Sequence, residues 1–194
     1  MSSTDTSTDT STDTSTDMGI DIEQTIQGLA EQIAAHNPAN PILIGIHTGG
    51  VWIAQRLQRI LGYSEPLGSL DISFYRDDFS RVGLHPEVKS SELPVAIEDR
   101  NIILIDDVLY TGRTIRAAMN EIFSYGRPNQ VKLGVLIERS GREIPIQADF
   151  VGCAMDQLDE SRQVKLTNEN GKLELNVIKI GANKTAASKT GAPG

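Results

Sequence analysis

The sequence predicts an α/β fold: a mostly parallel central sheet flanked by helices. Two segments carry this prediction, because each has a short aliphatic strand, then a glycine-containing loop, then an amphipathic helix. The first extends from Pro41 to Leu61 and the second from Ile102 to Tyr125. Alternating strands and helices form a parallel sheet, in which the carboxyl ends of the strands lie at one edge. Such folds bind their ligands at that edge. We therefore expect the functional residues directly after strands.

Length and composition predict one globular domain with two tails. The chain has 194 residues, of which 39% are hydrophobic, enough for a single core. Residues 1–17 repeat Ser-Thr-Asp-Thr, and residues 182–194 are small and polar. Neither segment can offset the entropy of ordering by burying apolar surface, so we expect disordered tails around a domain at residues 18–181.

The charge and cysteine content exclude several classes of protein. The net charge is −8, and four aspartates in residues 1–17 leave −4 on the remainder, which disfavours non-specific binding to nucleic acid. Cys153 is the single cysteine, so we expect neither a disulfide framework nor a cysteine-rich metal site. Because no signal peptide or apolar span of about 20 residues is visible, we expect a soluble cytoplasmic protein.

The first half of the domain is expected to alternate helix and strand. Apolar residues at helical spacing predict a helix from Asp21 to His36, with Asp21 as N-cap. A strand follows from Pro41 to Ile46, then a helix from Val51 to Leu61 and a strand from Leu67 to Tyr75. The next segment, Arg76 to Glu98, has two prolines and few apolar residues. So long an irregular connection is usually functional.

The second half begins with a buried strand at Ile102–Ile105 and a helix at Thr114–Tyr125. The helix is expected to stop at Gly126. Strands and a hairpin with an Asn-Gly turn are then predicted. Their ranges are Val131–Ile137, Asp149–Ala154, Val164–Thr167 and Leu173–Ile178.

Two adjacent carboxylates, Asp106 and Asp107, are expected where the strand Ile102–Ile105 ends. The loop after them, Tyr110 to Thr114, supplies backbone N–H groups and hydroxyls at a helix start, which favours a phosphate. Carboxylates repel a phosphate but accept hydrogen bonds from hydroxyls. The two acids and the loop together suit a ligand that has vicinal hydroxyls near a phosphate, such as ribose 5-phosphate. The alternative is that the two acids only end a strand and begin a turn.

The segment from Ile102 to Thr114 closely resembles the signature of type I phosphoribosyltransferases. That resemblance implies that Asp106 and Asp107 hold the ribose hydroxyls of phosphoribosyl pyrophosphate, while the loop holds the 5-phosphate. The positions implied in binding the donor or UMP are Asp106, Asp107, Val108, Leu109, Tyr110, Thr111, Gly112, Arg113 and Thr114.

The resemblance extends from about Asp21 to Gly152 and indicates a subfamily of these enzymes. The string Asp-Asp-Val-Leu-Tyr-Thr-Gly-Arg-Thr, with Ser73 to Asp78 upstream, resembles the bifunctional pyrimidine operon regulators that are also uracil phosphoribosyltransferases. The implied reaction converts uracil and phosphoribosyl pyrophosphate into UMP and pyrophosphate. Mg²⁺ is expected to bind through the substrate's phosphates, without a dedicated set of protein ligands. The resemblance also implies a homodimer or higher homo-oligomer.

A second phosphate loop is implied after the first core strand. The resemblance assigns Thr48, Gly49 and Gly50 to the pyrophosphate of the donor. Better-known regulators carry Lys-Thr-Arg-Gly here, whereas this chain has His47 and Gly49 in place of the two bases. We expect weaker donor affinity, or more reliance on a metal and on backbone amides. His47 is either a phosphate contact or an ordinary histidine at a strand end.

The irregular segment from residue 76 to about 94 is implied to be a flexible flap over the donor. Arg76 is the candidate contact to the pyrophosphate and completes the expected catalytic set with Asp106 and Asp107; Lys89 is a further candidate. Asp77 and Asp78 either meet the water shell of the metal or pair with neighbouring arginines.

The segment from residue 138 to 143 is implied to form a hood over the base. Arg139 is the residue expected nearest uracil. Arg142 is the candidate for a surface ion pair. Both follow a predicted strand, at the same sheet edge as the other loops.

Other functions remain open at this point. Purine-salvage members usually have an acid where this chain has Tyr110, and tyrosine, with a pKa of about 10, is a poor base at neutral pH. Orotate carries a carboxylate, so an enzyme for orotate would need an added cation in the base pocket. A UMP-responsive RNA-binding attenuation regulator is another alternative, as is a catalytically silent nucleotide sensor. The helix expected at Asp21–His36 lacks Lys and Arg, so RNA binding through it would lose phosphate contacts.

Overall fold

The computed structural model describes residues 19–72, 91–159 and 161–179. Its centre is a five-stranded sheet in the order β2-β1-β3-β4-β5, in which every neighbouring pair is parallel. The predicted fold class is therefore confirmed. The strands are β1 (Ile42–Ile46), β2 (Gly68–Leu70), β3 (Asn101–Leu109), β4 (Gln130–Arg139) and β5 (Phe150–Met155).

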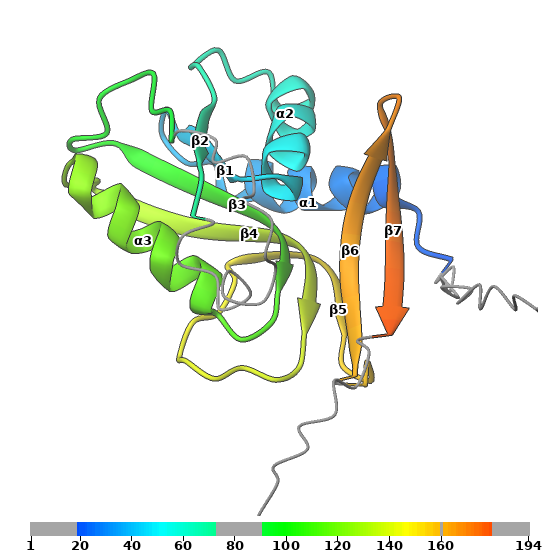
Figure 1. Ribbon diagram of the computed structural model, residues 1–194. Helices are drawn as coiled ribbons and strands as arrows, with labels where there is room; N and C mark the ends of the chain where they lie inside the picture. The colour runs from blue at the N-terminus through cyan, green and yellow to red at the C-terminus, as the bar shows by residue number, and fades with distance from the viewer. Residues whose placement is uncertain (1–18, 73–90, 160, 180–194) are drawn as a thin grey trace, which may run out of the picture.

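Helices cover both faces of the sheet (Figure 1). α1 (Ile22–His36) and α2 (Gly49–Leu61) lie on one face, and α3 (Arg113–Tyr125) lies on the other. Successive residues of β3 alternate between the two layers: Ile103 packs with α1 and α2, whereas Ile102 and Leu104 pack with α3. This burial on both sides explains why the strands are continuous aliphatic runs.

The hairpin of β6 (Arg162–Glu169) and β7 (Lys172–Lys179) extends the layer formed by α1 and α2. Its two strands are antiparallel and turn at Asn170 and Gly171, both with positive φ, 51° and 88°. That is the two-residue turn predicted from the Asn-Gly pair. Arg56 of α2 fixes the turn by donating to the carbonyl of Gly171 at 2.6 Å.

The first helix has the N-terminus expected from the sequence. Asp21 is its N-cap, and the carboxylate accepts a hydrogen bond from the N–H of Gln24 at 3.0 Å. At the other end Asn37 adopts a left-handed conformation. Within the described parts of the chain, no helix combines the length and the apolar character that a membrane crossing requires.

The two outer strands of the sheet have partners beyond the sheet. Ser69 of β2 exchanges two main-chain hydrogen bonds with Glu92, each 2.8 Å long. On β5, the side-chain amide of Gln32 donates to the carbonyl of Val151 at 2.8 Å and accepts from its N–H at 3.2 Å. At both edges of the sheet, main-chain groups of the outer strand are therefore bonded to a residue outside the sheet.

Several predictions lie outside the described residues. They are the two tails and most of the implied flap, including Arg76, Asp77, Asp78 and Lys89. The predicted strand at Leu67–Tyr75 is described only to residue 72, and it is shorter than expected, from Gly68 to Leu70.

Candidate active site

Asp106 and Asp107 do not end their strand as the sequence indicated; β3 continues for two further residues, to Leu109. The reason is the unequal length of the neighbouring strands. β1 pairs with β3 only as far as Ile105, whereas β4 pairs with it as far as Leu109. The two acids therefore lie beyond the last residue of β3 that pairs with β1, on a part of the strand that still pairs with β4.

The two carboxylates differ in exposure. Asp106 is buried, with 2% of its surface exposed, and its Oδ1 accepts a hydrogen bond from the N–H of Asp107 at 3.0 Å. Asp107 is half-buried, and its own Oδ1 accepts from the N–H of Val108 at 3.0 Å. Each carboxylate is thus oriented by the next residue of the strand, and Asp107 is the more accessible of the two.

The first turn of α2 lies directly against this tip of β3. α2 begins at Gly49, two residues earlier than predicted, so Gly49 and Gly50 belong to the helix start. A Cβ at Gly49 would lie 2.3 Å from Oδ2 of Asp107, and one at Gly50 would lie 2.3 Å from the carbonyl oxygen of Ile105. Only glycine at both positions allows the helix N-terminus, with its unpaired N–H groups, to approach the acids so closely.

The residues before α2 complete this loop. Thr48 is the N-cap residue of α2, and the peptide bond between His47 and Thr48 is cis. The N–H of His47 donates to the carbonyl of Leu70 at 2.9 Å, which ties the loop to β2. His47 is half-buried, and a contact between its side chain and a phosphate stays a prediction.

The phosphate loop, residues 110–113, consists of the three residues before α3 and the first residue of that helix. Gly112 is the N-cap of α3 with a positive φ of 91°, and the hydroxyl of Thr111 accepts from the N–H of Arg113 at 3.3 Å. The first N–H groups of α3 point to the loop without partners inside the helix, and the helix dipole favours an anion there. Arg113 pairs with Glu143 at 2.7 Å on the surface.

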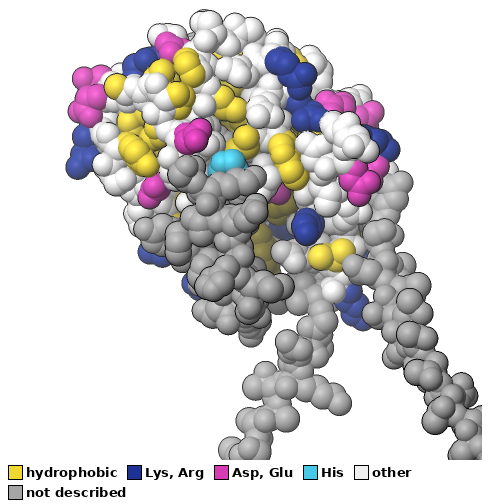
Figure 2. Space-filling model, turned by 45° about the horizontal axis from the view of Figure 1, so that its top comes forward, with side chains coloured by type: hydrophobic (Ala, Val, Ile, Leu, Met, Phe, Trp, Pro, Cys, Tyr) yellow, Lys and Arg dark blue, Asp and Glu magenta, His cyan; other side chains and the backbone are white. Residues whose placement is uncertain are grey.

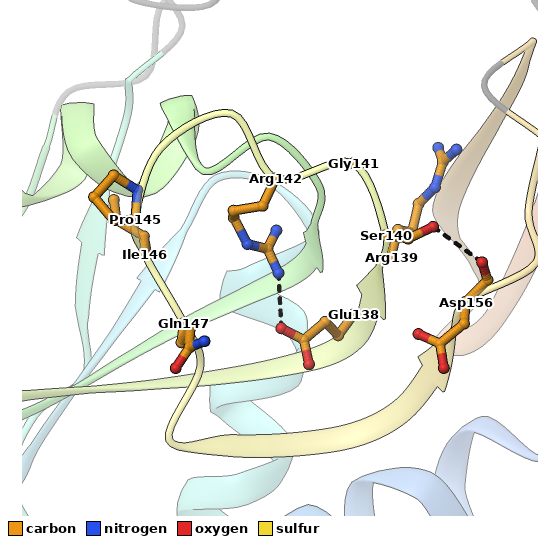
Figure 3. A pocket seen from close by; sticks show the side chains of 9 residues that line it. All are labelled: Glu138, Arg139, Ser140, Gly141, Arg142, Pro145, Ile146, Gln147 and Asp156. Carbon is orange, nitrogen blue, oxygen red and sulfur yellow. Dashed lines mark hydrogen bonds and ion pairs between the residues drawn. The ribbon is translucent and has the colours of Figure 1, made fainter.

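A cavity of about 300 Å³ lies beside the phosphate loop (Figure 3). Most of its lining comes from residues 138–147, which we call the hood loop, at the end of β4. The lining residues are Glu138, Arg139, Ser140, Gly141, Arg142, Pro145, Ile146, Gln147 and Asp156. The cavity is therefore mixed in character, with charged, amide and apolar groups.

Arg142 is an ion-pair residue, as expected, but it belongs to the cavity wall. Its Nη2 lies 2.7 Å from Oε1 of Glu138, and its Nη1 donates to the carbonyl of Tyr110. The side chain is only 22% exposed. Arg142 therefore connects the hood loop to the phosphate loop as well as pairing within the hood.

Arg139 has a different orientation from the one that a base contact would suggest. In Figure 3 its side chain points away from Arg142 and toward β6. It is 4% exposed, and its guanidinium donates to the carbonyls of Arg162 at 2.9 Å and Asp159 at 3.3 Å. A contact between Arg139 and a base remains a prediction; both Arg139 and Arg142 line the cavity.

Sequence reasoning did not single out the other polar residues of the cavity. Glu138 and Gln147 lie on the hood loop, and Asp156 follows β5. Their signal was positional, since Glu138 lies in the last two residues of β4 and Asp156 directly follows β5, at the same sheet edge as Asp106 and Asp107. No residue type marked them, because glutamate and glutamine are common on solvated loops.

Comparison with known proteins decides the family. The model of the phosphoribosyl transferase domain matches residues 18–167. The bifunctional protein PyrR of Nitrosococcus oceani is 58% identical over 142 residues, which cover 72% of this chain and 80% of that protein. The chain belongs to the PyrR family of phosphoribosyltransferases.

A second PyrR relative, from Pseudomonas paraeruginosa, is 51% identical over 138 residues, covering 71% of this chain and 81% of the relative. Among solved structures, the purine phosphoribosyltransferase of Pyrococcus horikoshii has a TM-score of 0.53 at 25% identity, over 69% of this chain and 82% of that chain. A hypoxanthine-guanine phosphoribosyltransferase of Bacillus anthracis has a TM-score of 0.57 at 20% identity, over 70% and 79% of the two chains. The PyrR assignment and the fold predicted from the signature are both confirmed.

Proposed function

We propose that this phosphoribosyltransferase transfers the phosphoribosyl group to uracil and releases pyrophosphate. The observation that carries the proposal is the shared edge of the sheet. There the two acids of β3 lie against the start of α2, and the phosphate loop leads from β3 into α3. The cavity of the hood loop adjoins the phosphate loop through Tyr110. The residues proposed to hold a sugar, a phosphate, a pyrophosphate and a base are thus contiguous.

Each part of the substrate has a proposed partner. Asp106 and Asp107 accept hydrogen bonds from the ribose hydroxyls. The 5-phosphate is held by the N–H groups and hydroxyls of Thr111, Gly112, Arg113 and Thr114, and the pyrophosphate by Thr48, Gly49 and Gly50. The whole set proposed to contact the nucleotide also includes Val108, Leu109 and Tyr110, with Arg76 and Arg139 as further candidates.

The chemistry asks the protein for positioning and charge stabilisation. The bond from carbon 1 of ribose to pyrophosphate breaks, a bond from carbon 1 to a ring nitrogen of uracil forms, and that nitrogen loses its proton. Positive charge develops on the ribose between these events. Carboxylates fixed beside the sugar stabilise it, and a fixed geometry lowers the entropic part of the barrier.

Mg²⁺ fits this site through its donor chemistry. It binds through one or two carboxylates together with substrate phosphates, and it keeps several waters. The half-buried Asp107 carboxylate lies at the start of α2, where the pyrophosphate is proposed to bind. When bound, the ion would neutralise charge on the leaving pyrophosphate. Asp107 would then help to orient the ion.

The proposal is tested by pyrophosphate release from phosphoribosyl pyrophosphate. Uracil, hypoxanthine and orotate are compared at equal concentration, with Mg²⁺ and with excess chelator. We expect release with uracil and Mg²⁺ only. Faster turnover with hypoxanthine or orotate would overturn the base assignment, and undiminished release in chelator would overturn the role of the metal.

A second function is UMP-responsive binding of RNA, since the matching relatives are named bifunctional. Electrostatics limit where RNA could bind. α1 carries no Lys or Arg, and Glu23 on it pairs with Arg56 at 2.9 Å. On the face shown in Figure 2, acidic and basic side chains of the described residues are interspersed.

Filter binding to the protein's own operon leader, with and without UMP, tests this second function. We expect binding through few phosphates, and therefore a shallow dependence on salt. A leader that binds no better than unrelated RNA, at any UMP concentration, would reject it.

The limits of the domain and its assembly are also proposals. We propose that residues 18–181 form the functional unit, flanked by the tails 1–17 and 182–194, and that it forms a homodimer or higher homo-oligomer. A chain restricted to residues 18–181 should keep the turnover of the full chain. Sedimentation equilibrium of both chains would measure the assembly, and a monomer would contradict it.

A further inference from the structure

We propose that Tyr110 is a positioning residue that clamps the hood loop to the phosphate loop and so holds the base cavity in shape. This inference rests on the proposed function, because it assigns the cavity to the base. It concerns a residue that the signature alone would place only among the nucleotide contacts. Three sets of contacts support it.

The ring of Tyr110 contacts two residues of the hood loop. The guanidinium carbon of Arg139 lies 4.3 Å from the ring centroid, close enough for a cation–π interaction. Gly141 also lies against the ring, because a Cβ there would come within 2.4 Å of Cε2 of Tyr110. Gly141 has a positive φ of 111°, so both its backbone and its neighbour require glycine.

Main-chain atoms of the phosphate loop make the second set of contacts. The carbonyl of Tyr110 accepts a hydrogen bond from Arg142, whose other nitrogen pairs with Glu138 in the cavity wall. The carbonyl of Thr111 accepts from the N–H groups of Glu143 at 3.1 Å and Ile144 at 3.3 Å. The two loops are thus joined through the carbonyls of Tyr110 and Thr111 as well as through the ring.

The third set of contacts fixes Arg139 from behind. Its guanidinium donates to the carbonyls of Asp159 and Arg162, at the start of the β6–β7 hairpin. Asp159 is itself held by the N–H of Ser161, which donates to its carboxylate at 2.7 Å. That hydrogen bond lowers the pKa of Asp159. These hydrogen bonds therefore hold the guanidinium of Arg139 in place against the ring of Tyr110.

The position of Tyr110 in the fold indicates that it holds the hood loop and does not stabilise the core. Tyr110 is half-buried and lies outside the two apolar clusters of the described core. Removing its ring would leave the sheet and helices packed, but it would remove the contacts that Arg139 and Gly141 of the hood loop make with the phosphate loop. The N–H groups at the start of α3 would stay in place. We therefore expect a loss of affinity for the base with little loss for the donor.

Steady-state kinetics of Tyr110→Ala and Tyr110→Phe test the clamp. We expect Tyr110→Ala to raise KM for uracil by about tenfold and KM for phosphoribosyl pyrophosphate by less than about threefold, since the ring alone carries a contact of that size. Tyr110→Phe keeps the ring and should restore most of the affinity for uracil. Equal rises in both KM values, or a Phe variant as weak as the Ala variant, would overturn the proposal.

A pair of glycine variants supplies the matched control. Gly141→Ala places a Cβ against the ring at a positive φ. Gly171→Ala has the same backbone strain, with a φ of 88°, but no atom within 4 Å of its Cβ. Gly171 lies at the far end of the hairpin from Arg162. We expect only Gly141→Ala to raise KM for the base; a similar rise in both would attribute the effect to strain.

Hydrogen exchange decides the clamp without reference to turnover. The amides of Glu143 and Ile144 should be protected in the wild-type protein and in Tyr110→Phe, and should exchange at least about tenfold faster in Tyr110→Ala. If uracil is not turned over, the proposed function fails while this measurement still tests the clamp. Unchanged protection in Tyr110→Ala would overturn the inference whatever base is used.

Discussion

Alanine at Gly50 should both destabilise the fold and impair the site. Its Cβ would lie 2.3 Å from the carbonyl oxygen of Ile105 and 3.1 Å from Cα of Asp106. Both obstacles are backbone atoms of the central strand, so no side chain can rotate to make room. α2 must instead move away from β3 at the point where Asp106 is held.

The size of the effect follows from the overlap. The methyl carbon and the carbonyl must separate by about 1 Å to reach ordinary contact distance. Overpacking of this kind costs about 1–3 kcal/mol in free energy of unfolding. The better helix propensity of alanine recovers at most about 1 kcal/mol. With the middle of that cost, about 2 kcal/mol, and the full recovery, the net loss is about 1 kcal/mol, which should lower Tm by about 2–4 °C in a domain of this length.

Thermal unfolding followed by circular dichroism measures this loss, with Gly28→Ala as the matched control. Gly28 lies within α1, and its Cβ would meet nothing within 4 Å. The same substitution should there raise stability by about 0.5–1 kcal/mol. A Gly50→Ala protein as stable as the wild type, or a Gly28→Ala protein that loses as much as Gly50→Ala, would refute the reasoning.

Three further predictions concern the site and its supports. Asp106→Asn and Asp107→Asn should each lower turnover by more than about tenfold, or about 1.4 kcal/mol of transition-state stabilisation, with circular dichroism unchanged; normal turnover in both would remove the ribose assignment. Asp149→Ala leaves the N–H of Leu133, now bonded at 2.8 Å, without its acceptor, so urea unfolding should show a loss of about 1–3 kcal/mol; no loss would mean that water replaces the carboxylate. Arg56→Met removes the hydrogen bond to the carbonyl of Gly171 that holds the hairpin turn, so amides of β6 and β7 should exchange faster than those of β3; equal acceleration in all three strands would indicate global destabilisation instead.

The sequence was sufficient for the layers of the fold, because its signals were local. Runs such as Ile102–Ile105 predicted strands buried on both faces, and the Asn-Gly pair predicted the hairpin turn. Asp21 marked the start of α1 to the residue. Each of these features is decided by neighbours within a few positions along the chain.

The length of β3 was not predictable in the same way. Two aspartates break an aliphatic run, and aspartate is depleted in strands, so the strand was expected to stop before Asp106. It continues because Val135 and Ile137 of β4 still pair with it there, after β1 has ended. Such a boundary depends on relative strand lengths, which only the assembled sheet determines.

The cavity was predicted in place but not in detail. The sequence indicated that residues after β4 face the site, and named Arg139 as the contact to the base. The structure orients Arg139 toward Tyr110 and the carbonyl of Arg162 while the residue also lines the cavity, so its contact with a base stays a prediction. Arg139, the last residue of β4, and Arg142, three positions later, look alike in sequence, and their tertiary partners decide how each is oriented. The hairpin that orients Arg139 lies more than twenty residues further along the chain.

The partners at the two outer strands bear on how copies of the chain behave when crowded. An unpaired strand at a sheet margin is a template onto which another molecule can add its own strand, the usual route to aggregation and domain swapping. Here Ser69 is occupied by Glu92, and Val151 by the amide of Gln32. A foreign strand would have to displace a bonded partner at either margin. We therefore expect copies to associate through helical or hairpin surfaces and not through a continuous intermolecular sheet.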